Sequence, residues 1–306
     1  MILTVTLNFA LDVTYAAPRV RWRYTNRVSV VGRRAGGKGV NVARVLHALG
    51  RDAVVTGLAG GATGAAARAE LERSGLIDAT VSVRDQSRVT IIVVERDGEV
   101  TGFSEPGPEV TAAEWARLLA RFHELLGAAE AVVLSGSLPP GVPLDAYAQL
   151  IAIAAAADLP VLLDAEQEAL ARGVAAGPQL VKINAGELDG FAPGLDVFSG
   201  AARLRAAGAG AVVVSEGPAG LVGLTESGAW RAVPPRVSGG NPTGAGDAAA
   251  AALVAGMVDA SPWPQRLSDA AALSAAAVSA PMAGSFDQSA YRRLRGEVIV
   301  REQTPP

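Results

Sequence analysis

Short apolar segments with strand character alternate with helical segments along most of this sequence. Strands are predicted at 2–7, 53–58, 131–134, 160–163, 179–183 and 211–215. Helices are predicted after them, most clearly at 64–74, 111–126, 144–157 and 197–207. This alternation is typical of a mostly parallel central sheet covered by helices on both faces. The sequence therefore predicts an α/β fold.

Two polar segments, about 10–35 and 87–105, interrupt this alternation. Both have strand character, and Asp97-Gly98 in the second is a strong hairpin signal. We expect them to pair into a small β-sheet lid over the carboxyl ends of the parallel strands, where ligands bind in open α/β folds. Residues 1–306 contain no linker or internal repeat, so a single domain carrying this lid is predicted.

Composition argues against several classes of protein. The 306 residues carry a net charge of −3, which offers no basic excess for nucleic acid, and they include no cysteine for thiol catalysis or thiolate metal sites. The two histidines, His47 and His123, lie in amphipathic helical segments and are predicted to be structural or on the surface. The N-terminus does not resemble a signal peptide, and no apolar stretch reads as a membrane span. We expect a cytoplasmic protein without nucleic-acid or membrane partners.

Residues 241–258 open with a sequence suited to binding an anion. Thr243 is predicted to be the N-cap of a helix. Gly244 and Gly246 lie in its first turn, where backbone N–H groups lack intrahelical acceptors and attract phosphate. Asp247 places a carboxylate beside them. The combination suits phosphoryl transfer, in which amides hold the developing charge and a base accepts the hydroxyl proton.

Two other interpretations of this helix start remain open on these residues alone. Acidic residues are common in first turns because they complement the helix dipole. The spacing Gly244-x-Gly246-x-x-Ala249 also matches a dinucleotide-binding fingerprint. That fingerprint should follow a strand directly, whereas Pro234 and Pro235 precede this one. The nicotinamide interpretation is therefore disfavoured.

A second glycine-rich helix start lies at 36–41, with the sequence Gly-Gly-Lys-Gly-Val-Asn. Gly32 completes the spacing of a Walker A loop, but Gly39 stands where that loop needs Ser or Thr for Mg²⁺, so it is not a P-loop. Its backbone can still approach a polar ligand, with Lys38 contacting an anion and Asn41 bonding hydroxyls. A tight turn with a solvated lysine is equally compatible. Two such starts suggest a site for two polyoxygenated ligands.

Together, the Gly-Gly-Lys-Gly-x-Asn and Gly-Ala-Gly-Asp motifs resemble the two signatures of the ribokinase-like (PfkB) sugar kinases. The resemblance covers essentially the whole chain and implies a three-layer αβα fold. Segments 6–12, 105–109, 134–141 and 181–187 are similar to the 1-phosphofructokinase and tagatose-6-phosphate kinase branch. Phe9 and Ile183 replace prolines that are usual there, and Asn241 stands where many relatives have Asp, which bears on the substrate more than on kinase activity.

The resemblance implies roles for individual residues. The catalytic base and the anion hole for the transferred phosphate are assigned to Asp247, Gly244, Ala245 and Gly246. The site for the sugar and its existing phosphate is assigned to Asp12, Gly36, Gly37, Lys38, Asn41, Arg88 and Ser137. The ATP site is assigned to Lys182, Asn184, Glu187, Ser215, Gly217 and Gly220. Glu187 is expected to act on Mg²⁺ through water. Independently of the resemblance, Asp164 at a strand end could be functional, but a structural role is favoured.

The predicted activity is ATP- and Mg²⁺-dependent phosphorylation of a ketohexose monophosphate to the bisphosphate. The fructose 1-phosphate and tagatose 6-phosphate types are both compatible with the motifs. Two alternatives remain: a kinase of an unphosphorylated sugar or nucleoside, and a non-catalytic nucleotide- or sugar-binding regulator on the same fold. Aromatic residues in the lid segments, as in relatives, predict a homodimer through the lid.

Overall fold

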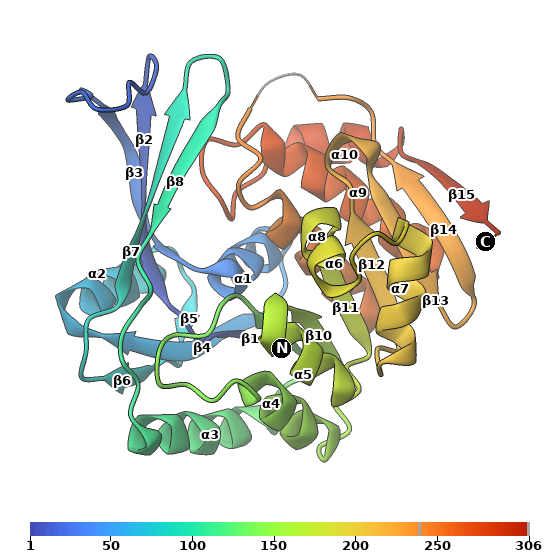
Figure 1. Ribbon diagram of the computed structural model, residues 1–306, viewed down its shortest axis with the longest axis horizontal. Coiled ribbons are helices and arrows are strands. Elements are labelled where there is room, and N and C mark those ends of the chain that lie inside the picture. Colours follow the sequence, from blue (N-terminus) through green and yellow to red (C-terminus); the bar gives the residue numbers. More distant parts are fainter. Residues whose placement is uncertain (238–239, 305–306) are drawn as a thin grey trace.

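A computed structural model describes residues 1–237 and 240–304, and its body is built around one long sheet (Figure 1). The strand order is β15-β14-β13-β12-β11-β10-β9-β1-β4-β5, with β6 also paired to β4. The strands of this sheet are β1 (Ile2–Thr6), β4 (Ala53–Gly60), β5 (Ile77–Asp78), β6 (Val81–Val83), β9 (Ala131–Ser135), β10 (Val161–Asp164), β11 (Leu180–Asn184), β12 (Ala211–Ser215), β13 (Leu221–Thr225), β14 (Gly228–Val233) and β15 (Ile299–Gln303). From β5 to β12 neighbouring strands run parallel, and β13, β14 and β15 add an antiparallel edge.

Helices cover both faces of this sheet, because its central strands are apolar on both sides. The α-helices are α1 (Lys38–Ala48), α2 (Gly61–Arg73), α3 (Ala112–Leu126), α4 (Ala146–Ala155), α5 (Gln167–Ala175), α6 (Ala185–Phe191), α7 (Val197–Ala206), α8 (Ala245–Val258), α9 (Trp263–Val278) and α10 (Gln288–Arg295), and a 3-10 turn, η1, spans Gly217–Ala219. One face packs against α1, α2, α8 and α9, and the other against α3 to α7. This is the predicted three-layer α/β fold with a mostly parallel sheet.

A separate four-stranded sheet projects from the body, at the upper left of Figure 1. Its strands are β2 (Ala10–Ala17), β3 (Ser29–Gly36), β7 (Arg88–Glu95) and β8 (Val100–Ser104). Two antiparallel hairpins, β2–β3 and β7–β8, are joined side by side through the parallel pair β2–β7. The two segments that interrupt the strand–helix alternation therefore do form a small sheet together, which we call the lid.

Three strand ends and two helix starts converge beside the lid. The strands β10, β11 and β12 end at Asp164, Asn184 and Ser215. Helix α1 begins directly after lid strand β3, and it packs against α8. Polar residues from distant parts of the chain are therefore brought to one edge of the sheet. No helix among the described residues combines the length and apolarity needed to cross a bilayer.

Candidate active site

A cavity of about 970 Å³ lies at this edge of the sheet, between the lid and the body. Such a volume is at the upper end of the usual range for small-molecule sites. It is lined by all but two of the residues singled out from the sequence: Asp12, Gly37, Lys38, Asn41, Arg88, Lys182, Asn184, Glu187, Ser215, Gly217, Gly220, Gly244, Ala245, Gly246 and Asp247. The exceptions are Gly36, which is buried behind Asp12, and Ser137, which lines a neighbouring cavity.

The start of α8 differs from the prediction in one respect. The N-cap is Gly244 and not Thr243, because the chain turns through a left-handed conformation at Gly244, with φ of 86°. The Thr243 N–H instead donates to Asn241 Oδ1 at 3.0 Å. A Cβ atom on Gly244 would lie 2.8 Å from Ala283 Cα, so both backbone conformation and space require glycine here.

The first turn of α8 presents free backbone donors, as anion binding requires. The Ala245 N–H donates to the Pro242 carbonyl at 3.1 Å. Within 1–237 and 240–304, no acceptor is found for the amides of Gly244 and Gly246. A Cβ atom on Gly246 would lie 2.6 Å from Lys182 Nζ, so an ammonium group stands directly against this turn. Amides and ammonium together make a strongly anion-attracting corner.

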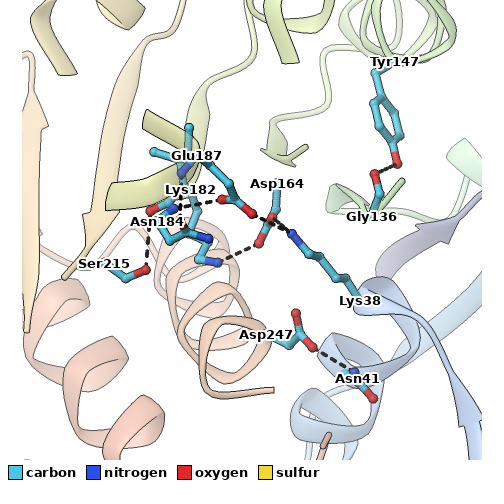
Figure 2. Close-up of polar contacts among 11 residues, drawn as sticks. Lys38, Asn41, Gly136, Tyr147, Asp164, Lys182, Asn184, Glu187, Ser215 and Asp247 are labelled. Atoms are coloured by element: carbon cyan, nitrogen blue, oxygen red, sulfur yellow. Dashed lines mark hydrogen bonds and ion pairs between the residues drawn. The ribbon is translucent and has the colours of Figure 1, made fainter. Parts of the chain in front are cut away.

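Asp247 lies one residue further along α8, at the wall of the cavity (Figure 2). Its residue is only 7% exposed, and Asn41 Nδ2 on α1 donates to its Oδ2 at 2.8 Å. Burial, and secondarily the negative charge of Asp164, raise the pKa of Asp247 to about 6. The lysines and the Asn41 hydrogen bond limit this rise. A carboxylate with this pKa can accept a proton near neutral pH.

Two lysines share one fully buried carboxylate, Asp164 (Figure 2). Lys38 Nζ lies 2.8 Å from Asp164 Oδ1, and Lys182 Nζ lies 2.8 Å from Oδ2. Lys38 Nζ also lies 3.3 Å from Glu187 Oε1. Burial acts to raise the pKa of Asp164, but the two lysines outweigh it and hold that pKa below its ordinary value. From the sequence a structural role was favoured over a functional one for Asp164, and its side chain holds two cations at the cavity.

The ATP-site candidates follow two neighbouring strand ends. Asn184 and Glu187 form a capping box at the start of α6, in which Glu187 N–H donates to Asn184 Oδ1 at 2.8 Å and Asn184 N–H donates to Glu187 Oε2 at 3.0 Å. The wall beyond Ser215 is mainly apolar, although Arg236 and Ser274 also line it, and none of its apolar residues was assigned to the site from the sequence: Leu221, Pro234, Pro235, Val237, Ala271, Ala275 and Val278. A largely apolar wall beside polar strand ends suits a nucleobase.

The lid contributes Asp12 from β2 and Arg88 from β7. Arg88 Nε donates to the Asn8 carbonyl, and Arg88 Nη1 donates to Thr90 Oγ1, each at 3.1 Å. Burial raises the pKa of Asp12, and Arg88 only partly counteracts this. Gly36 is paired with Ala10, and a Cβ atom there would lie 2.0 Å from Asp12 Cγ. Gly36 is therefore needed for the close approach of β3 to the Asp12 carboxyl group.

A second cavity, of about 690 Å³, adjoins the first and shares Gly37, Lys38, Arg88 and Ser104 with it. It is lined by the turn after β9, where Ser137 Oγ accepts from Asn8 Nδ2 at 3.1 Å. Ser135 Oγ is buried there and has no hydrogen-bond partner in the part of the chain that the structure describes. Arg88 thus stands where the two cavities meet, with N–H groups left for a ligand.

Comparison with known proteins agrees with this geometry. Residues 8–289 match the family model described as pfkB family carbohydrate kinase. The 1-phosphofructokinase of Escherichia coli (strain K12) is 35% identical over 300 residues, covering 96% of each chain. The crystal structure of phosphofructokinase-2 from Escherichia coli in complex with fructose-6-phosphate has a TM-score of 0.86 at 29% identity, and the tetrameric inhibited form of that enzyme has 0.86 at 30% identity, each covering 97% of this chain and 98% of the other. This chain belongs to the pfkB family of carbohydrate kinases, enzymes that transfer a phosphoryl group to a sugar hydroxyl.

Proposed function

We propose that this kinase uses ATP and Mg²⁺ to phosphorylate a ketohexose monophosphate, of the fructose 1-phosphate or tagatose 6-phosphate type, to the bisphosphate. The observation that carries the proposal is the position of Asp247. It is a buried carboxylate with a raised pKa, beside free amides and within one cavity with a lid arginine. The names of the relatives support the substrate class, since one is a 1-phosphofructokinase and another holds fructose-6-phosphate.

In the proposed mechanism, Asp247 accepts the proton of the attacking sugar hydroxyl. The hydrogen bond from Asn41 fixes the Asp247 carboxylate between α1 and α8. The γ-phosphoryl group passes in line to that oxygen, over the turn formed by Gly244, Ala245 and Gly246. The free amides of this turn and the Lys182 ammonium stabilise the negative charge of the transition state.

The sugar phosphate occupies the lid side of the site in this proposal. Asp12, Gly37 and Asn41 hold the sugar, because their carboxylate, backbone and amide groups can bond hydroxyls, and Gly36 acts behind them by letting β3 approach the Asp12 carboxyl group. Arg88 binds the phosphate already on the substrate, with Ser137 assisting from the adjoining cavity. Lys38 connects the two halves of the site, because it belongs to the glycine-rich segment 36–41 and its ammonium group contacts Asp164 and Glu187.

The nucleotide half is proposed to lie along β11, β12 and the apolar wall. ATP is held there by Lys182, Asn184, Glu187, Ser215, Gly217 and Gly220. Mg²⁺ bound with ATP neutralises charge on the phosphates. The donor set fits contact through water and not direct ligation, because the Glu187 oxygens already accept from Asn184 N–H and Lys38. Mg²⁺ retains much of its hydration in such sites. A cytoplasmic location is part of this proposal, because the reaction needs ATP and a sugar phosphate in the same compartment.

We also propose that residues 1–306 act as one kinase domain, with about 10–35 and 87–105 as its lid, and that two copies pair through the lids. Trp22 and Tyr24, in the connection between β2 and β3, are 67% and 71% exposed, Phe103 on β8 is 48% exposed, and the Trp22 and Phe103 rings lie 6.3 Å apart. Exposed aromatic clusters of this kind mark protein contacts. A solution mass of one chain for the wild type would contradict the pairing. Trp22→Glu should halve the mass, whereas Leu195→Glu, at an exposed leucine outside the lid, should not.

The function is tested by coupled ADP detection over a panel of ketohexose phosphates, free sugars and nucleosides. Arg88→Ala should raise the KM for the sugar phosphate about tenfold to a hundredfold, because a charged hydrogen bond to the phosphate is lost. Arg96→Ala, an exposed arginine on the same hairpin, is the matched control. Turnover of free sugars alone would establish the unphosphorylated-sugar alternative, and ATP binding without ADP release would establish a regulator.

A further inference from the structure

A buried ion pair lies outside both cavities, behind the glycine-rich segment 36–41. Arg44 on α1 and Glu70 on α2 contact each other directly, with side chains only 9% and 13% exposed. Glu70 is fully engaged, because its Oε1 also accepts from Ser74 Oγ at 2.7 Å. Neither residue lines the cavities described above. Buried ion pairs often contribute little net stability but can fix one conformation. The important question is therefore which part of the chain this pair holds in place.

What this pair holds is the backbone of Ala35, the residue before the glycine-rich run. The Ala35 N–H donates to Glu70 Oε2 at 2.8 Å, and the Ala35 carbonyl accepts from Arg44 Nη2 at 3.3 Å. Strand β3 is an edge of the lid sheet, with β2 on one side only. The N–H and C=O of one strand residue point to the same side. The ion pair therefore takes the place of a neighbouring strand at the root of the lid.

A change in the position of Ala35 would affect the sugar site, because the next two residues lie against Asp12. Gly36 follows it, with room for only a hydrogen beside the Asp12 carboxyl group. Gly37 comes next, with φ of 105°, and its amide hydrogen-bonds Asp12. A movement of β3 by a few tenths of an ångström would therefore displace both Asp12 and the Gly37 backbone. The nucleotide half, along β11 and β12, has no contact with Arg44 or Glu70 among the hydrogen bonds and ion pairs of the described residues.

We propose that the Arg44–Glu70 pair is a positioning device for the sugar half of the site, acting through the Ala35 backbone. It determines how tightly the sugar phosphate binds and leaves ATP binding unaffected. The inference rests on the proposed function, since it needs a sugar phosphate at Asp12 and Gly37. Arg44 and Glu70 touch neither substrate, so their effect is separable from that of the residues lining the cavity.

The test compares Glu70→Gln and Glu70→Leu with wild type by steady-state kinetics for each substrate. Glu70→Gln keeps the shape of the side chain but removes the charge that orients Arg44. Glu70→Leu removes both acceptors. We expect the KM for the sugar phosphate to rise about threefold and tenfold respectively, while the KM for ATP stays within about twofold. Glu72→Gln is the matched control, because Glu72 is exposed on the same helix and should behave as wild type.

The thermal midpoint of each variant separates positioning from general destabilisation. Equal rises in both KM values, or a lower midpoint with an unchanged sugar KM, would overturn the proposal. If Glu70→Leu does not fold, Glu70→Gln alone tests the proposal. A wild-type KM for the sugar phosphate in Glu70→Gln would then refute the positioning role. A wild type that turns over no ketohexose phosphate refutes the proposed function itself and removes the basis for this inference. If the wild type is active and the Glu70 variants keep the wild-type KM for the sugar phosphate, only the positioning role is refuted.

Discussion

Replacing Asp247 with asparagine should greatly lower kcat and stabilise the fold at the same time. The two effects have one cause, which is the burial of an ionisable group at the start of α8. Asp247 is 7% exposed, and burial together with Asp164 raises its pKa from an ordinary value of 3.8 to about 6. A carboxylate whose pKa is raised on folding is ionised at a cost to the folded state. Asparagine has a similar shape and no charge, so Asp247→Asn removes that cost.

The size of the effect follows from the two pKa values. The difference between 3.8 and about 6, at about 1.4 kcal/mol per pH unit, corresponds to about 3 kcal/mol at pH 8. Weakening the charged hydrogen bond from Asn41 offsets about 1 kcal/mol of this. A net gain of about 2 kcal/mol should raise the thermal midpoint by about 3 °C, because the unfolding entropy of a 306-residue chain is about 0.6 kcal/mol/K. The loss of a general base should lower kcat by about 10²- to 10⁴-fold.

The stabilisation by Asp247→Asn should depend on pH in a defined direction. Because the folded-state pKa of Asp247 lies above 3.8, the cost is fully present above about pH 6 and disappears as the pH falls toward 3.8. The net stabilisation by Asp247→Asn should therefore shrink at pH 5 to about a third of its value at pH 8, because about 1.4 kcal/mol of the cost disappears between these pH values. Thermal unfolding of wild type, Asp247→Asn and Asp52→Asn, an exposed control, measures this. A gain independent of pH, or a variant that is active and no more stable, would refute the argument.

Three further predictions concern the same site. The kcat/KM of the wild type should fall below about pH 6, where Asp247 becomes protonated, and a rate profile that stays flat to pH 5 would contradict its role as base. Asn41→Leu removes a hydrogen bond that lowers the Asp247 pKa, so the acid limb of that profile should move to higher pH, and an unmoved limb would exclude this coupling. Gly246→Ala would set a Cβ atom 2.6 Å from Lys182 Nζ, so single-turnover rates should fall at least about tenfold, and a wild-type rate would show that the first turn tolerates displacement of the ammonium group.

The layered fold could be predicted because several strands of the parallel sheet are short apolar runs, such as Ala-Val-Val-Leu in β9 and Ala-Val-Val-Val in β12. The lid followed from strand character and from Asp97-Gly98, where Gly98 takes the positive φ of 92° that such a turn requires. Helices α5 and α6 were not predicted, since each is short and begins just after a polar strand end. Strand β15 was also missed, because it is a largely exposed edge strand whose pairing with β14 joins segments far apart in the chain.

The candidate site was predictable where one local motif carries the chemistry, and not where distant residues must meet. The glycines and Asp247 stand together in the sequence, so their shared cavity was foreseeable. Asp164 was undervalued because its importance comes from Lys38 and Lys182, which reach it from other elements. Thr243 was taken for the N-cap because propensity favours it. Nearby Asn241 accepts its N–H instead, and Gly244 makes a left-handed turn that threonine resists.

Five consecutive alanines, Ala248–Ala252, follow Asp247 in α8 and contribute to its burial. All five alanines are buried, in a helix that packs against both α1 and α9. Small side chains let neighbouring helices pack closely. Asn41 on α1 lies 2.8 Å from Asp247 on α8, and Asp247 is only 7% exposed, so little water solvates its carboxylate. Larger residues would separate the helices and let the pKa of Asp247 return toward 3.8, leaving an ionised but weaker base. We therefore expect the alanine run to help raise the pKa of Asp247, although no alanine among these five needs to touch the substrate.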